Sequence, residues 1–233
     1  MLIDALRSLA SGQGVDFFGV LMQVLATVFV MVLILPLHEF AHGYVAYKLG
    51  DPTAKRAGRL TLNPIASLDP IGSVGLLLFG IGWAKPVPVD PRYFRNPKRG
   101  MAVTALAGPA SNVLAAFVGA FLDNLLYVLP LPIPNRAFLL LSIFFYYYVS
   151  INLMLAVFNL LPIPPLDGSR IVAAFLPNRM MYAYYRYERV LVGVLFLLLF
   201  LGVLDPVLYF LQEHLWNAVM WLATAPFRLF GLL

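Results

Sequence analysis

The feature that most constrains the fold is a run of 21 residues, Phe17 to Leu37, that contains no charged side chain. A helix of about 20 apolar residues is long enough to cross the hydrocarbon core of a bilayer. Hydrophobic residues make up 61% of the 233-residue chain and charged residues 12%, whereas a soluble domain is about a quarter charged. The sequence therefore predicts an all-α multi-pass membrane protein, in which residues 1–233 form a single integral-membrane domain.

Two further apolar stretches predict the rest of a three-span core. They run from Met101 to about Leu122 and from about Ala137 to Leu161, so the core covers residues 17–170. One to two C-terminal hydrophobic segments follow within residues 183–233. The stretch 190–204 offers only 15 uncharged residues, which is short for a span. The pattern leaves open whether the C-terminal segment crosses the membrane or lies in its interface.

A small re-entrant or β element is expected after the first span. Residues 70–83 are apolar and rich in glycine, but 14 residues are too few to cross a bilayer. The following residues 84–89 contain Pro86 and Pro88, which exclude a helix and favour an extended backbone.

Charge predicts the orientation of the spans. Residues 48–100 carry nine Lys and Arg and residues 162–189 carry four, whereas Arg136 is alone in the loop between the second and third spans. Positively charged loops remain in the cytoplasm. We therefore expect a protein of the cell membrane, whose first span ends at the cytoplasmic side.

The pentapeptide His38-Glu39-Phe40-Ala41-His42 follows the first uncharged run directly. Positions i and i+4 share one face of a helix, so His38 and His42 can hold one metal ion together. The chain has no cysteine, so a zinc ion would take its ligands from His, Asp or Glu. The alternative is a helix with two interfacial histidines and a glutamate that reaches into the headgroup region.

Catalytic zinc takes three protein ligands and a water, which leaves a third ligand to be found. Asp167 and His214 are the candidates, and Asp167 is preferred because the end of the third span brings it to the depth of the two histidines. We expect one zinc ion per chain. Taken alone, Asp167 fits a helix cap or a solvated loop carboxylate equally well.

Glu39 is the residue type that activates water beside such a metal, and it would accept the water proton and pass it to a leaving amine. The oxygen anion formed during hydrolysis needs a donor besides zinc. Asn112 is the amide of the small-residue cluster 108–112 and is the expected donor. Close packing of helices explains the same cluster equally well.

These motifs together resemble the site-2 protease family of intramembrane zinc metalloproteases over residues 30–170. The resemblance rests on four segments: residues 38–42, residues 108–112, residues 159–168, and the stretch from Asn63-Pro64 to Asp69-Pro70 and Gly72. Many members of the family carry an inserted PDZ domain or a nucleotide-sensing domain, and this sequence shows neither, so it resembles a minimal form.

The resemblance implies a three-span core and a role for each motif. It assigns zinc to His38, His42 and Asp167, makes Glu39 the catalytic base, and brings Asn112 and Asn159 near the substrate. The extended residues 83–90 would correspond to the family's membrane-associated β element.

The expected function is that of an intramembrane zinc metalloprotease, which hydrolyses a peptide bond in or near a substrate transmembrane segment, as in regulated intramembrane proteolysis. The expected partners are a membrane-spanning protein substrate and the lipid bilayer, without nucleic acid; the sequence does not indicate an oligomeric state. Val87 is expected to help hold an unwound substrate by strand addition. The alternatives are a catalytically inactive scaffold or adaptor that retains the metal site, and a transporter. The transporter alternative is disfavoured because the sequence lacks a repeated half and a second cluster of intramembrane carboxylates.

Overall fold

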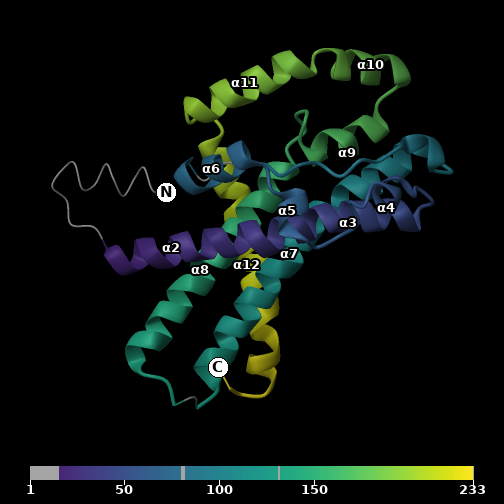
Figure 1. Ribbon diagram of the computed structural model, residues 1–233. Helices are drawn as coiled ribbons and strands as arrows, with labels where there is room; N and C mark the ends of the chain where they lie inside the picture. Colours follow the sequence, from purple (N-terminus) through teal and green to yellow (C-terminus); the bar gives the residue numbers. More distant parts are fainter. Residues whose placement is uncertain (1–15, 80–81, 131, 233) are drawn as a thin grey trace.

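The computed structural model describes residues 16–79, 82–130 and 132–232 (Figure 1). Three of its helical stretches are long and apolar enough to cross a membrane: Phe17–Lys48, Pro97–Val128 and Asn135–Asn159. These stretches coincide with the three predicted spans. The predicted all-α multi-pass class is therefore confirmed for the described residues.

The first span is a continuous helical stretch that changes its winding before the HEFAH pentapeptide. It consists of α2 (Phe17–Phe29), a π-helical turn (Val30–Ile34) and α3 (Leu35–Lys48). Pro36 has no N–H to donate, and its ring crowds the carbonyl one turn earlier. A π-helical turn widens the backbone there and lets the helix pass the proline. The pentapeptide therefore lies on the same helical stretch that begins at Phe17.

The long helix α7 (Pro97–Val128) is the centre of the bundle and contacts α3, α8 (Asn135–Asn159), α9 (Asp167–Phe175) and α12 (Asp205–Leu229). Its buried face consists mainly of small side chains, which allow close approach of neighbouring helices. The core beside it is filled by larger side chains from the first span and α8, including Val30, Val149 and Leu153.

The C-terminal hydrophobic segments form two helices that meet at 83°. Helix α11 (Glu188–Phe200) has 13 residues, or about 20 Å, and is too short to cross a bilayer alone. Together with α10 (Asn178–Arg186) it lies across one end of the bundle, whereas α12 runs alongside α7 and α8 (Figure 1). The side-chain amide of Gln212 ties α12 to α8 by donating to Ser150 O and Oγ, each at 3.0 Å. The pair α11–α12 provides at most a fourth, bent span.

The predicted β element is not found among the described residues. Residues 70–79 form helix α6 (Pro70–Phe79), and the only β pairing in the described part of this region is an isolated antiparallel bridge between Leu68 and Ala84. Lys85 N–H donates to Ser67 O at 2.7 Å, but Pro86 and Pro88 have no N–H with which to continue a ladder. The extended backbone that the prolines predict is present as irregular chain rather than as a strand.

Candidate metal centre

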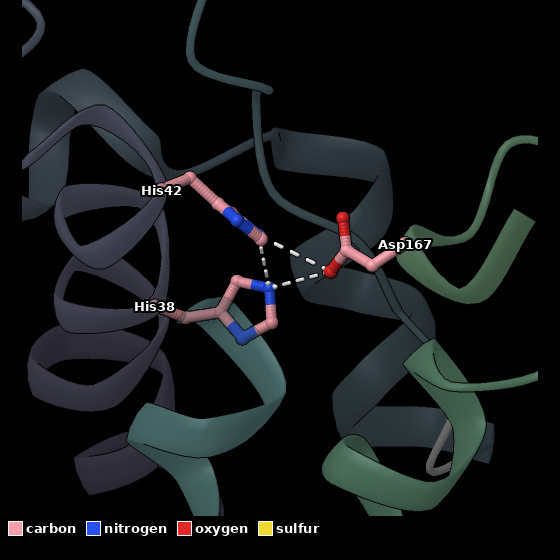
Figure 2. Close-up of side chains that lie close together, drawn as sticks. All are labelled: His38, His42 and Asp167. Carbon is pink, nitrogen blue, oxygen red and sulfur yellow. Dashed lines mark hydrogen bonds and ion pairs between the residues drawn. The ribbon is translucent and has the colours of Figure 1, made fainter. Parts of the chain in front are cut away.

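Two histidines of α3 and one aspartate of α9 converge on a common point (Figure 2). His38 Nε2 and His42 Nε2 are 3.0 Å apart, and Asp167 Oδ2 lies 3.3 Å from His38 Nε2 and 3.1 Å from His42 Nε2. All three side chains are buried. Among the described residues, this is the one group of three His, Cys, Asp or Glu side chains close enough to share a metal ion.

These separations fit zinc. Ligand atoms placed tetrahedrally about 2.0–2.1 Å from zinc lie about 3.3–3.4 Å from one another, close to the three observed distances. His214, the other candidate for third ligand, is exposed on α12, where its Nδ1–H donates to Phe210 O at 2.8 Å. Asp167 therefore completes the group that the pentapeptide begins.

The opposite nitrogen of each imidazole is held by an oxygen acceptor of α7. His42 Nδ1 lies 2.7 Å from the backbone oxygen of Thr104, and His38 Nδ1 lies 2.5 Å from Asn112 Oδ1. A carbonyl oxygen only accepts, so each Nδ1 carries the hydrogen and each Nε2 presents a lone pair. Two lone pairs and a carboxylate oxygen then face one another within 3.3 Å. That arrangement is electrostatically unfavourable unless a cation lies between them, which is a second reason why these residues fit a metal.

Gly108 lets α7 approach the two imidazoles. A Cβ atom at this position would lie 2.3 Å from His42 Nε2 and 2.5 Å from His38 Nε2, well inside van der Waals contact. Gly108 belongs to the small-residue cluster 108–112, and its effect is more specific than close packing of helices. Because glycine has no side chain, the space beside the metal-binding atoms of His38 and His42 stays open.

Asp167 is the first residue of α9, where the N-terminal end of the helix dipole favours a negative charge. Burial alone would raise the pKa of its carboxyl, but when His38 and His42 are protonated, their hydrogen bonds and charge outweigh burial and hold that pKa below its usual range. Positive charge at this point, on an imidazolium or on a metal, keeps Asp167 ionised.

At the other end of α9, Lys98 Nζ donates to Leu176 O at 2.6 Å and fixes the helix to the start of α7.

Glu39 lies next to the metal-binding group but is not part of it. Its Oε2 accepts the backbone N–H of Val87 at 2.9 Å. The Val87 side chain is 6% exposed and packs beside Gly43, where its Cγ1 would be 3.1 Å from an added Cβ. Asp51, which is fully buried in the turn that follows α3, accepts the Asp90 N–H at 2.7 Å. The extended segment 82–90 is thus tied to Glu39 of α3 and to the turn beyond that helix, and these contacts orient Glu39.

A cavity of about 380 Å³ opens beside these residues. Its walls combine the metal-binding group and Glu39 with α8, α11 and the extended segment, and include Asn159, Val87, Phe158, Leu195 and Arg170. Asn159 lies on this wall, and its Nδ2 donates to Leu155 O at 2.9 Å. Asn112 does not line the cavity; it is fully buried behind His38.

Sequence reasoning missed two groups behind the histidines. The Thr104 carbonyl is a backbone acceptor, which residue patterns do not reveal. Asn152 accepts from Asn112 Nδ2 at 3.2 Å. The sequence does indicate a partner for Asn152, because an amide in the middle of an apolar span is costly unless it is hydrogen-bonded.

Comparison with known proteins agrees with this geometry. The model of peptidase family M50 matches residues 125–202. The chain is 45% identical over 150 residues to "Putative zinc metalloprotease YwhC" of Bacillus subtilis, covering 64% of this chain and 68% of that protein. It is 32% identical over 158 residues to "Putative zinc metalloprotease Rip2" of Mycolicibacterium smegmatis, covering 66% of this chain and 57% of that protein.

A third relative is archaeal. "Putative zinc metalloprotease MJ0611" of Methanocaldococcus jannaschii is 34% identical over 137 residues, with 58% of this chain and 62% of that protein covered. No solved structure matches the chain. The chain belongs to peptidase family M50, the site-2 protease family of zinc metalloproteases.

Proposed function

We propose that this zinc metalloprotease cuts a peptide bond in or near a transmembrane segment of a membrane-spanning protein. One observation carries the proposal: the buried His38–His42–Asp167 group lies on and beside a helical stretch, Phe17–Lys48, that is itself long and apolar enough to span a bilayer. A substrate bond must reach that depth to be hydrolysed.

The metal ligands and Glu39 have different roles in peptide hydrolysis. Zinc, when bound by His38, His42 and Asp167, supplies a Lewis acid that polarises a carbonyl and lowers the pKa of a water. Glu39 accepts the proton from the attacking water and delivers it to the leaving amine. The Val87 N–H engages Glu39 Oε2, which leaves the other carboxylate oxygen to carry that proton.

The developing oxygen anion needs hydrogen-bond donors besides the metal. Asn159 and Arg170 are our candidates because both line the cavity with the metal-binding group. The expectation that Asn112 is this donor stays a prediction. Against it, Asn112 Oδ1 faces His38 Nδ1, and its Nδ2 donates to Asn152. We therefore propose that Asn112 acts on the metal site through His38.

The substrate must unwind before cleavage, because a helix shields its own carbonyl groups. We propose that the unwound segment lies against residues 82–87, which contribute one wall of the cavity, with apolar contacts from Phe158 and Leu195. The Val87 N–H is engaged by Glu39, and Pro86 and Pro88 have none. Residues 86–88 therefore offer a substrate carbonyl oxygens but no N–H, so strand addition at Val87 stays a prediction that has to use those oxygens. We propose that Val87 also orients Glu39.

The charge bias of the loops supports a location in the cell membrane with the metal site near the cytoplasmic face. The biological roles that fit are release of a membrane-tethered regulator and clearance of leftover membrane peptides. Both roles require hydrolysis of a peptide bond in or near a transmembrane segment.

Cleavage by purified protein tests the proposal. Wild-type protein and the Glu39→Gln variant are reconstituted in liposomes with a membrane-spanning test substrate, and fragments are mapped by mass spectrometry. We expect wild-type protein to cut within or beside the membrane segment, and Glu39→Gln to retain zinc without cutting. If both proteins hold zinc and neither cuts any membrane substrate in a panel, the scaffold function replaces the proposal.

A further inference from the structure

A chain of buried hydrogen bonds runs from α8 through α7 to the metal ligand His38. Asn152 Nδ2 donates to Tyr148 O at 2.8 Å, Asn112 Nδ2 donates to Asn152 Oδ1 at 3.2 Å, and Asn112 Oδ1 lies 2.5 Å from His38 Nδ1. Asn112 and Asn152 are both 0% exposed. Neither amide can exchange these partners for water.

The direction of every bond in this chain is fixed from its far end. The Tyr148 carbonyl only accepts, so Asn152 must turn its NH₂ group toward it and its oxygen toward Asn112. Asn112 must then turn its own NH₂ group toward Asn152 and its oxygen toward His38. That oxygen accepts the Nδ1 hydrogen of His38, which leaves Nε2 with the lone pair that a metal requires.

The two histidines differ in how their tautomers are fixed. His42 Nδ1 bonds to a backbone carbonyl, at Thr104, which cannot rotate to present a donor. His38 Nδ1 bonds to a side-chain amide, which can present either its oxygen or its NH₂ group. Only the His38 side of the site therefore depends on a second residue to set the orientation of its acceptor.

We propose that Asn152 is a positioning residue for the metal centre. It orients the Asn112 amide and, through it, selects the His38 tautomer whose Nε2 binds zinc. Without Asn152, the Asn112 amide can reverse and place its NH₂ group against His38 Nδ1. His38 then holds its hydrogen on Nε2, and this tautomer cannot bind the metal.

A purely structural role for Asn152 makes a different prediction. Amides within a span also join helices by hydrogen bonds. If Asn152 served only to join α7 and α8, its loss would lower the stability of the protein without a specific decrease in zinc affinity. Asn124 supplies a matched control. It is a buried amide of α7 that donates to the carbonyl four residues earlier, at 2.8 Å, as Asn152 does in α8. It is 12 residues from Asn112, or about 18 Å along the helix.

The test compares the zinc affinity of Asn152→Leu and Asn124→Leu in detergent, by competition with a chromophoric chelator. Circular dichroism and thermal unfolding of the zinc-free proteins record folding separately. Loss of a group that orients a ligand typically costs about 10–100-fold in metal affinity. We expect a loss of this size for Asn152→Leu and less than about threefold for Asn124→Leu. The Co²⁺-loaded Asn152→Leu protein should also show an altered d–d absorption spectrum.

A double variant distinguishes amide orientation from general loosening of the helices. An aspartate at position 112 presents only acceptor oxygens, so it accepts from His38 Nδ1 without help from Asn152. We expect Asn112→Asp combined with Asn152→Leu to bind zinc about tenfold more tightly than Asn152→Leu alone. Zinc affinity of Asn152→Leu within threefold of wild type, or no recovery in the double variant, would overturn the proposal.

Discussion

Replacement of Gly108 by alanine adds one methyl group at the point where α7 approaches both imidazoles. The new Cβ would lie 2.3 Å from His42 Nε2, whereas unbonded heavy atoms rest about 3.5 Å apart. The ring or the helix must therefore move by about 1 Å. Metal–ligand distances tolerate only about 0.2 Å, and the Nδ1 bonds of His38 and His42 resist rotation of the rings.

The expected result is selective loss of metal. We expect the zinc affinity of Gly108→Ala to fall at least about 100-fold, the upper end of what disturbed ligand orientation costs. The stability of the zinc-free protein should change much less than its zinc affinity. Overpacking costs about 1–3 kcal/mol, and alanine regains about 1 kcal/mol over glycine in a helix, so the expected net loss of stability is about 0–2 kcal/mol.

The assay is chelator competition on detergent-purified protein, with zinc-free thermal unfolding measured in parallel. Gly100→Ala is the matched control, because it lies on the same helix, eight residues or about 12 Å from Gly108, and a Cβ there would lie 2.4 Å from the Phe94 ring. Gly100→Ala should lose stability and keep its zinc affinity. If Gly108→Ala binds zinc within threefold of wild type, α7 does not limit the space beside the metal.

Further predictions concern the supports around the metal-binding group. Val87→Pro removes the N–H that Glu39 Oε2 accepts, so cleavage should slow while zinc content, measured by mass spectrometry, stays unchanged; an unaltered cleavage rate would contradict this role. Lys98→Met removes the donor to Leu176 O that holds the end of α9. It should lower the free energy of unfolding by about 1–2 kcal/mol in a denaturant titration, whereas equal stability would show that the bond is dispensable. Asp167→Asn removes the only anionic ligand of the group, so zinc affinity should fall at least about tenfold, and retention of wild-type affinity would exclude Asp167 as a ligand.

Much of the fold follows from patterns that are local in the sequence. Uncharged runs long enough to cross a bilayer predict the three spans, because the bilayer leaves few alternatives to a helix. The His38 and His42 pair follows from helical spacing. Asp167 required one additional step, the alignment of span ends by charge, and the structure brings it to the two histidines.

Other features depended on contacts between distant segments. The interpretation of residues 84–89 as part of a β element treated extended backbone as a strand, although Pro86 and Pro88 deprive that segment of the donors a ladder needs. The expectation that Asn112 faces the substrate rests on residues 108–112 alone and stays a prediction, because these residues do not identify its partner on α8, Asn152. Helix pairing decides which way a buried amide points, and sequence spacing within one helix does not contain that information.

The zinc content of the purified protein tests the metal-site assignment most directly. Wild-type protein, isolated without added metal and washed free of loose ions, should contain about one zinc per chain, and Asp167→Ala should contain almost none while remaining helical. Wild-type protein without zinc that also fails to take it up on titration would contradict the assignment of His38, His42 and Asp167 as a zinc site, on which the cleavage chemistry proposed for Glu39 depends.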